Sequence, residues 1–278
     1  MTWVEPLISD NLAGIPATSL NVVFGAILDF LLLSLRVGSF LLAAPFFGSR
    51  MVPLNIRIIL TFSLAFFLYG WVEVPNINNL NLLGIFSIIT VELAIGLTAG
   101  LIFAIAFSSV SLAGEKIAAT SGLSFALQVD PSTGTQSPVI SQFLTLFLLM
   151  IFFATDSHLV AFNLILQSYA TVPIGAKVEF ERFYQTGFIV SEDLFQNAAI
   201  IMLPVVGVLF LINLAVGIIT RSAPQLNLFS FGFPITILSV MFLLYLSVPP
   251  FAAMFVNLIE DHIILFSDLI AEVSNGRK

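Results

Sequence analysis

The chain has 278 residues, of which 59% are hydrophobic and only 9% charged, and its formal net charge is −7. About a quarter of the residues in a soluble protein are charged, so the composition excludes an ordinary soluble domain and indicates a membrane protein. The acidic balance argues against nucleic acid as a partner, and the sequence contains no cysteine for disulfides or thiolate-bound metals.

Six apolar blocks follow one another along the chain, and each is a candidate membrane-spanning helix. They cover residues 21–42, 51–71, 82–107, 138–171, 198–220 and 232–256. Continuous blocks of this kind are typical of α-helical spans rather than of alternating barrel strands. We therefore expect an all-α membrane protein with about six long hydrophobic helices arranged as hairpins. The segment before residue 20 lacks the basic residues and apolar core of a cleavable signal, so the first block is expected to direct membrane insertion.

The expected organisation has five parts. An N-terminal segment covers residues 1–20, and N-terminal helical hairpins cover 21–171 and contain a central loop at 114–134. A connector follows at 172–197, then a C-terminal helical hairpin at 198–256 and an acidic amphipathic tail at 257–278. Proline and glycine mark tight turns between the first two blocks and between the last two, namely Pro45, Gly48 and Pro53, and then Pro224, Gly232 and Pro234.

Charged residues inside the apolar blocks need partners. Asp29 and Arg36 lie in the first block, about 10 Å apart along a helix, which is too far for a simple intrahelical bridge. Glu92 lies in the third block, and each such charge costs roughly 2.5–3.5 kcal/mol at the membrane centre. We expect these three residues, with Arg221, to pair between helices or between subunits. Gly96 and Gly100 form a small-xxx-small pattern that permits close helix approach.

Two apolar stretches are longer than a bilayer requires. Residues 82–120 contain no strong helix breaker and would extend about 58 Å as a helix, and residues 138–171 would extend about 50 Å. A bilayer core is only about 30 Å thick. Either the Asp156-Ser-His158 sequence ends one span and starts another element, or these helices belong to a protein body that projects from the membrane.

The central segment GEKIAATSGLSFALQVDPSTG, residues 114–134, is neither an ordinary hydrophilic loop nor a plausible span. Apolar residues are spread through it, yet it contains Glu115, Lys116, Gln128 and Asp130. Its small residues lose much entropy on ordering and bury little area, so we expect it to be rigid only when surrounded. A simpler interpretation is that its glycines permit a helix–turn–helix reversal.

The connector and the tail have distinct patterns. Residues 173–197 mix charged and aromatic side chains, which indicates an interfacial or extramembrane hairpin. Beyond Val256, apolar residues recur with a helical period on one face and acidic residues lie on the other. An acidic polar face is poorly suited to anionic lipid, so we expect this helix to dock against protein.

Three motifs resemble one known family. RVGSFLLAAPFFGSRMVPLNIRIIL (residues 36–60), GEKIAATSGLSFALQVDP (114–131) and RSAPQLNLFSFGFPITI (221–237) are similar, in order and spacing, to the R-type subunit of the flagellar and type III secretion export gate, the FliR family. The hairpin signature positions are Pro45, Gly48, Pro53, Arg57, Pro224, Gln225, Asn227, Gly232 and Pro234.

The resemblance implies a fold and a set of partners. The N-terminal part would resemble a P-type subunit and the C-terminal part a Q-type subunit, both built into a helical ring with copies of those subunits. Further expected partners are the B-type switch subunit, unfolded exported proteins and membrane lipid, and the expected location is the flagellar basal body in the bacterial inner membrane. No cofactor is implied.

The resemblance also implies that the central loop plugs the closed pore. The corresponding residues are Gly122, Leu123, Ser124, Phe125 and Ala126, flanked by Gly114, Glu115, Asp130 and Pro131. Thr120 and Ser121 stand where relatives often have Gln-Met, which reduces the apolar bulk of the seal.

Two other functions stay open from the residues alone. A secondary transporter would use Glu92 and Asp29 to bind a solute or ion, and a purely structural scaffold would have no lumen-facing loop. An enzyme has no residue set to support it, because the sequence lacks the Walker, H-E-x-x-H, G-x-S-x-G and dinucleotide motifs.

Overall fold

The computed structural model describes residues 17–48, 52–72, 74–75, 81–123, 138–223 and 231–275. Within these ranges the protein consists of helices joined by turns, which confirms the expected all-α class. The helices are α2 (Ala17–Ala43), α3 (Pro45–Gly48), α4 (Leu54–Leu68), α5 (Leu82–Thr120), α7 (Val139–Ala154), α8 (Ser157–Thr171), α9 (Phe180–Ser222) and α10 (Phe233–Asn275).

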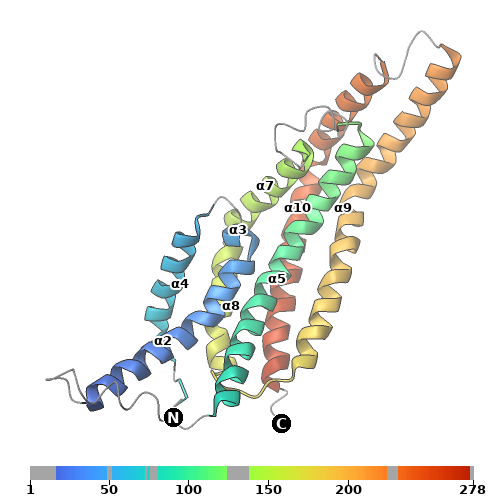
Figure 1. Ribbon diagram of the computed structural model, residues 1–278. Helices are drawn as coiled ribbons and strands as arrows, with labels where there is room; N and C mark the ends of the chain where they lie inside the picture. The colour runs from blue at the N-terminus through green and yellow to red at the C-terminus, as the bar shows by residue number, and fades with distance from the viewer. Residues whose placement is uncertain are drawn as a thin grey trace.

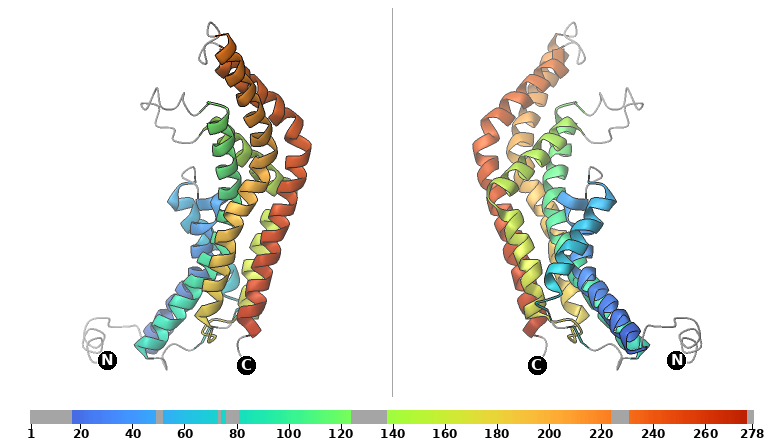
Figure 2. Two further views of the ribbon diagram at one scale, coloured as in Figure 1. Left: turned by 90° about the vertical axis from the view of Figure 1, so that its right-hand side faces the viewer. Right: turned by 90° about the vertical axis from the view of Figure 1, so that its left-hand side faces the viewer.

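The long helix α5 is the axis of the molecule, and α2, α7, α9 and α10 all pack against it (Figure 1). The α2–α4 hairpin covers one side of α5, and the α9–α10 hairpin covers another and extends past the upper end of α5 (Figures 1 and 2). The first turn follows from its prolines. Pro45 begins α3, Pro53 precedes α4, and Arg57 donates from Nη2 to the carbonyl of Val52 at 3.0 Å.

The expected count of six spans is not confirmed. Four of the described helices are long and apolar enough to cross a membrane, and a bent helix pair makes a fifth. Helix α4 has only 15 residues, which is short for a span. By contrast, the uninterrupted helix expected over residues 82–120 is confirmed as the 39 residues of α5.

The second long stretch is broken. Helix α7 ends at Ala154, α8 begins at Ser157, and the two axes differ by 68°. Asp156, with φ of 55°, lies in the left-handed region that ends helices. The helix is therefore interrupted at Asp156–His158, as the first of the two interpretations requires, while the position of these helices relative to the membrane stays a prediction.

The connector does not form the expected hairpin. Helix α9 begins at Phe180 and continues for 43 residues, so most of the 173–197 segment extends the following helix. Its charged side chains are spaced along an otherwise apolar helix, where they are exposed or half-buried. Its placement outside the membrane stays a prediction.

The C-terminal tail is helical, as expected, but it is continuous with the sixth block. Helix α10 runs through Pro249 and Pro250, and α9 runs through Pro204. The apolar face of the tail is buried in the core, whereas its acids are exposed, which confirms docking against protein. The buried tail residues are Leu258, Ile259, Phe266, Leu269, Ile270 and Val273.

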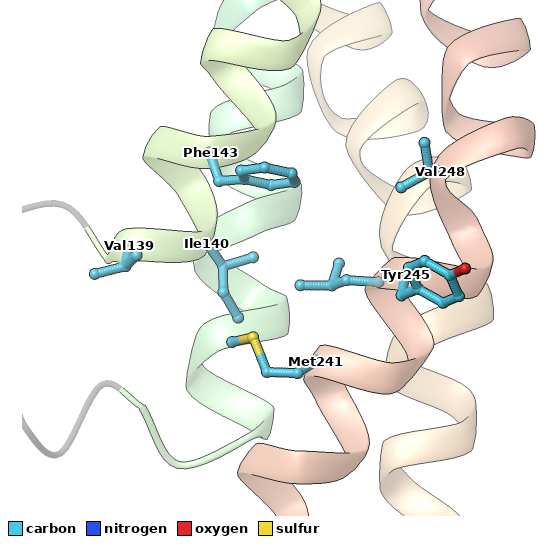
Figure 3. Close-up of a pocket in the computed structure, with 7 residues that line it drawn as sticks. Val139, Ile140, Phe143, Met241, Tyr245 and Val248 are labelled. Atoms are coloured by element: carbon cyan, nitrogen blue, oxygen red, sulfur yellow. The ribbon is translucent and has the colours of Figure 1, made fainter.

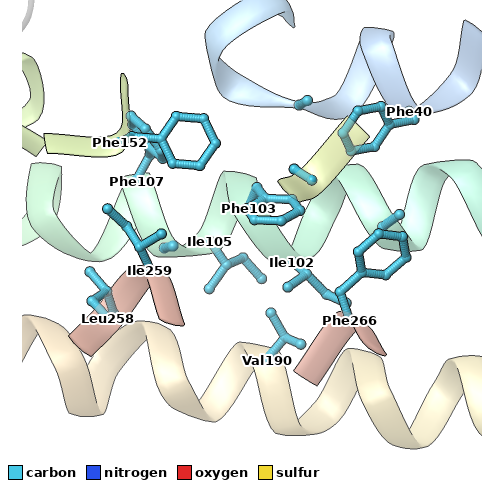
Figure 4. Close-up of a cluster of buried hydrophobic side chains, with 14 of the residues drawn as sticks. Phe40, Ile102, Phe103, Ile105, Phe107, Phe152, Val190, Leu258, Ile259 and Phe266 are labelled. Atoms are coloured by element: carbon cyan, nitrogen blue, oxygen red, sulfur yellow. The ribbon is translucent and has the colours of Figure 1, made fainter. Parts of the chain in front are cut away.

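The core lies where α5 meets the surrounding helices (Figure 4). Phe103 of α5 is 2% exposed and makes edge-to-face ring contacts with Phe40 of α2, Phe152 of α7 and Phe266 of α10. Such aromatic pairs contribute about 0.5–1.5 kcal/mol each beyond area burial. This cluster therefore connects the N-terminal helices to the C-terminal hairpin.

Candidate functional site

Two polar arrangements interrupt the apolar interior, and the first is a buried ion pair between α2 and α5. Arg36 and Glu92 are both 0% exposed. Arg36 Nε lies 2.8 Å from one carboxylate oxygen of Glu92, and Nη2 donates to the other at 3.0 Å. A bidentate pair of this geometry fixes both the distance and the rotation of the two helices.

Helix α8 completes the arginine's hydrogen bonding. Arg36 donates from Nη1 to Ser168 Oγ at 2.9 Å and from Nη2 to the carbonyl of Val172 at 2.9 Å. The guanidinium carbon lies 4.2 Å from the ring centroid of Tyr169, whose hydroxyl donates to the carbonyl of Leu33 at 2.7 Å. Three helices that are distant in the sequence are thus held at one point, which offsets the desolvation cost of burying a charge.

Glycines on α5 permit this approach. A Cβ on Gly96 would overlap Ser39 Oγ and the Arg36 carbonyl, and a Cβ on Gly100 would overlap the Cβ of Ala43. The small-xxx-small pattern therefore lies at the α2–α5 contact, as expected for close helix packing. At this contact both oxygens of Glu92 accept from Arg36, so the charge of the carboxylate is already paired within the fold.

The other two candidate pairing residues lie elsewhere. Asp29 is half-buried in the first half of α2, and Arg221 is exposed in the last turn of α9. In the part of the chain that the structure describes, neither forms an ion pair or a side-chain hydrogen bond with another residue.

The second polar arrangement is the root of the central segment, where α5 ends. Gly122, with φ of 82°, follows the C-cap residue Ser121. The amide of Leu123 donates to the carbonyl of Ala118 at 3.1 Å, and the amide of Gly122 donates to that of Ala119 at 3.2 Å. These two bonds form a Schellman motif, which ends a helix and turns the chain away from its axis.

The C-terminal hairpin satisfies the remaining carbonyls at this helix end. Asn213 of α9 donates from Nδ2 to the carbonyl of Thr120 at 3.0 Å, and Thr236 of α10 donates to that of Ser121 at 3.0 Å. A Cβ on Gly122 would lie 2.8 Å from the ring of Phe233. The point at which the central segment leaves α5 is therefore held by α9 and α10 as well as by α5.

The predicted start of the central loop is wrong. Gly114 and Glu115 belong to α5, which continues to Thr120. A Cβ on Gly114 would overlap the backbone of Ser141 in α7, so this glycine allows α5 and α7 to pack closely. Ser141 also donates to the carbonyl of Ser111 at 3.0 Å. The segment between the two helices is anchored at both ends, at Leu123 and at Pro138.

Several predicted residues lie outside the described residues, namely Ser124, Phe125, Ala126, Asp130, Pro131, Pro224, Gln225 and Asn227. Of the remaining signature positions, Gly232 and Pro234 lie at the start of α10, next to Thr236. The C-terminal motif and the central motif therefore meet in space although about 100 residues separate them.

An apolar groove of about 350 Å³ lies between α7 and α10 (Figure 3). Val139, Ile140 and Phe143 line it from α7, opposite a second wall formed by α10 (Figure 3). That wall consists of Met241, Leu244, Tyr245 and Val248. The groove begins one residue after Pro138, where the central segment rejoins the helical body.

Sequence reasoning missed the residues that complete both arrangements. Ser168 and Tyr169 belong to no recognised motif, and only their polarity distinguishes them from the other residues of their apolar block. Asn213 offered a stronger signal, because an amide inside an apolar helix requires a hydrogen-bond partner. Within the described ranges, no group of three or more His, Asp or Glu side chains is placed to hold a metal ion.

Comparison with known proteins identifies the family. Residues 27–262 match the model of the bacterial export proteins, family 1. The chain is 29% identical to the flagellar biosynthetic protein FliR of Pectobacterium carotovorum over 87% of its length and 92% of the relative. It is 28% identical to FliR of Escherichia coli K12 over 86% and 91%, and 32% identical to FliR of Bacillus subtilis 168 over 78% and 85%.

These relatives are named for flagellar biosynthesis, and their names denote no enzyme. Together with its apolar helices, the matches make the chain a membrane component of the flagellar export apparatus. The chain belongs to the bacterial export proteins, family 1, as a member of its FliR branch.

Proposed function

We propose that this protein is a core, non-enzymatic subunit of the flagellar export gate, in which it lines the channel for unfolded exported proteins and closes it with residues 122–126. The observation that carries the proposal is the double anchoring of the central segment. A segment that seals a pore needs fixed ends and a yielding middle. Here the helix end at Gly122 is held by Asn213 and Thr236, and the return at Pro138 leads into the tightly packed α5–α7 contact.

The composition of the segment supports a reversible seal. Residues 123–129 contain Leu123, Phe125, Leu127 and Val129 among small side chains. If they bury about 200–300 Å² of apolar surface, the transfer free energy is roughly 5–8 kcal/mol. A free energy of this size closes a passage and can still be overcome when a chain is driven through it.

The partners in this proposal are P-type and Q-type export-gate subunits, the B-type switch subunit and the exported chains, with the assembly at the basal body in the bacterial inner membrane. The surface of α4 supports a multi-subunit arrangement. This helix packs mainly on α2, and large apolar side chains remain exposed along it: Ile56, Ile58, Ile59, Phe62, Phe66 and Phe67. Asp29 and Arg221 would then find their opposite charges on neighbouring subunits.

The test is a deletion of residues 124–130 in the chain co-assembled with its partners in liposomes. We expect the resting permeability to small ions to rise, because the seal is removed while the helix ends remain. A second variant replaces Leu123, Phe125, Leu127 and Val129 by serine at constant length, and the same leak is expected if apolar contacts form the seal.

A deletion of residues 76–80, in the connection between α4 and α5, is the matched control and should leave permeability unchanged. Intact impermeability after removal of residues 124–130, with the complex still assembled, would show that the segment is not the stopper.

A further inference from the structure

One buried titratable group has no part in either polar arrangement. His262 of α10 is 2% exposed and faces the interior among apolar residues. Its Nδ1 lies 2.8 Å from the carbonyl of Leu258. Because a carbonyl oxygen only accepts, Nδ1 carries a hydrogen, and in the neutral ring Nε2 is an acceptor. Nε2 is buried and has no hydrogen-bond partner.

The register of α9 against α10 places a carboxylate at the level of this histidine. Arg182 and Glu272 form an ion pair with 3.7 Å between their atoms, near the start of α9 and the end of α10. Asp193 is 11 residues after Arg182, and His262 is 10 residues before Glu272. At 1.5 Å per residue these positions lie about 16 and 15 Å from that ion pair, so they are at the same height.

The packing gives the same placement. Val190 of α9 is 1% exposed and lies between Leu258 and Phe266 of α10 (Figure 4). Asp193 is three residues beyond Val190 and so on the same side of α9, while His262 is midway between Leu258 and Phe266 on the same side of α10. The two residues therefore lie at the same height on the facing sides of α9 and α10.

The charges around the ring are few. The carboxylate of Asp193 on α9 acts electrostatically on His262, as does that of Asp261 on α10 itself, and Glu192 acts on Asp193. Helices α5, α7 and α8 also pack on α10, and no charged side chain on their described residues acts on the ring. The titratable groups of α5 and α8 have other surroundings. Glu92 is bound to Arg36, and the Tyr169 hydroxyl donates to Leu33. His158 is half-buried against the ring of Phe153, and Glu115 and Lys116 are exposed.

We propose that His262 and Asp193 form a proton-binding pair between α9 and α10, which draws the two helices together when it takes up a proton. In the neutral state, Nε2 is an unpaired acceptor facing a carboxylate that can only accept. A proton from water that binds Nε2 turns it into a donor and gives the ring the charge opposite to Asp193. A charge-assisted hydrogen bond between the two side chains can then form where two acceptors could form none. The inference does not depend on the proposed sealing role of residues 122–126.

The test is ¹⁵N-histidine NMR of the full chain in nanodiscs. The chain has two histidines, and His158→Gln assigns the remaining signal to His262. In Asp193→Asn we expect the protonation midpoint of His262 to fall, because the removed carboxylate favours the cation across the α9–α10 interface. Glu192→Gln removes the neighbouring charge and should shift the midpoint by clearly less.

A distance measurement tests the mechanical part. Since the sequence contains no cysteine, spin labels can be placed at the exposed positions Phe188 and Ile264. We expect the distance distribution to shorten or narrow below the His262 midpoint and to lose this response in His262→Gln. An equal midpoint in the parent and Asp193→Asn chains would overturn the pairing. A distance distribution that is the same at both pH values in the parent would overturn the helix movement.

Discussion

At the residue scale, the most constrained side chain is Arg36, which makes four hydrogen bonds and stacks on an aromatic ring without access to water. A buried ion pair contributes little net stability relative to an apolar pair of the same size, but loss of one member leaves an uncompensated charge. The pair therefore specifies which faces of α2, α5 and α8 meet.

This asymmetry predicts a characteristic mutant cycle. Arg36→Met should lower the free energy of unfolding by about 3–5 kcal/mol, because Glu92 remains buried and unpaired. The double variant Arg36→Met with Glu92→Met should lose much less than either single variant. Denaturant unfolding in mixed micelles measures all three values, and strictly additive losses would contradict a coupled pair.

Gly122 is constrained by its backbone as well as by its surroundings. Its φ of 82° and the ring of Phe233 both exclude a side chain. Gly122→Ala should destabilise the protein by about 1–2 kcal/mol, as expected for an L-residue forced into the left-handed region. Gly207→Ala is the control in unfolding experiments. It lies within α9 with open space around it, and the substitution should be neutral or stabilising by up to about 1 kcal/mol.

At the scale of elements, α5 is the helix on which the others are assembled. Three of its glycines lie at two helix contacts, Gly96 and Gly100 against α2 and Gly114 against α7. Its last carbonyls accept from α9 and α10. Because helices in a membrane gain little from the hydrophobic effect, close backbone approach and interhelical hydrogen bonds are the main sources of specific association.

The close approach of α2 and α5 predicts that side chains larger than glycine are poorly tolerated at their contact. Gly96→Ala should separate the two helices and weaken the Arg36–Glu92 bonds, at about 1–3 kcal/mol, because the added methyl overlaps backbone atoms that cannot rotate away. Gly25→Ala in α2, where nothing lies within 4 Å, is the matched control. Equal thermal stability of the two variants would argue against close packing as the reason for the motif.

At the scale of the whole molecule, much apolar surface is uncovered along α4 and along the α9–α10 hairpin beyond the end of α5. A membrane protein exposes such surface to lipid, but α4 is too short to span a bilayer alone. The proposed cover by other export-gate subunits would account for both features.

The corresponding prediction concerns assembly. Co-expression with P-type and Q-type partners should raise the thermal stability of the detergent-extracted chain, since a partner present at 100 times its Kd stabilises the bound form by about 2.7 kcal/mol. Size exclusion with fluorescence detection measures the change. Co-expression with an unrelated membrane protein is the control, and an equal effect in both cases would count against specific subunit contacts.

The sequence by itself determined the all-helical membrane class, the unbroken α5, the amphipathic tail and the motifs of the family. These properties depend on composition and on local periodicity, which do not require knowledge of distant contacts. It also identified Arg36 and Glu92 as residues in need of partners, since an isolated charge in an apolar helix is costly wherever the helix lies.

Only the tertiary structure decided which partners they have. The pairing of Arg36 with Glu92 spans 56 residues, and the bond from Thr236 to the end of α5 spans 115. Glu115 shows the same limit, because the sequence allowed both a helix to Thr120 and a loop from Gly114, and the structure has the helix, with Gly114 packed on α7. Local sequence patterns show that a buried polar residue requires a partner. The packing of helices that are distant in the sequence determines which residue that partner is.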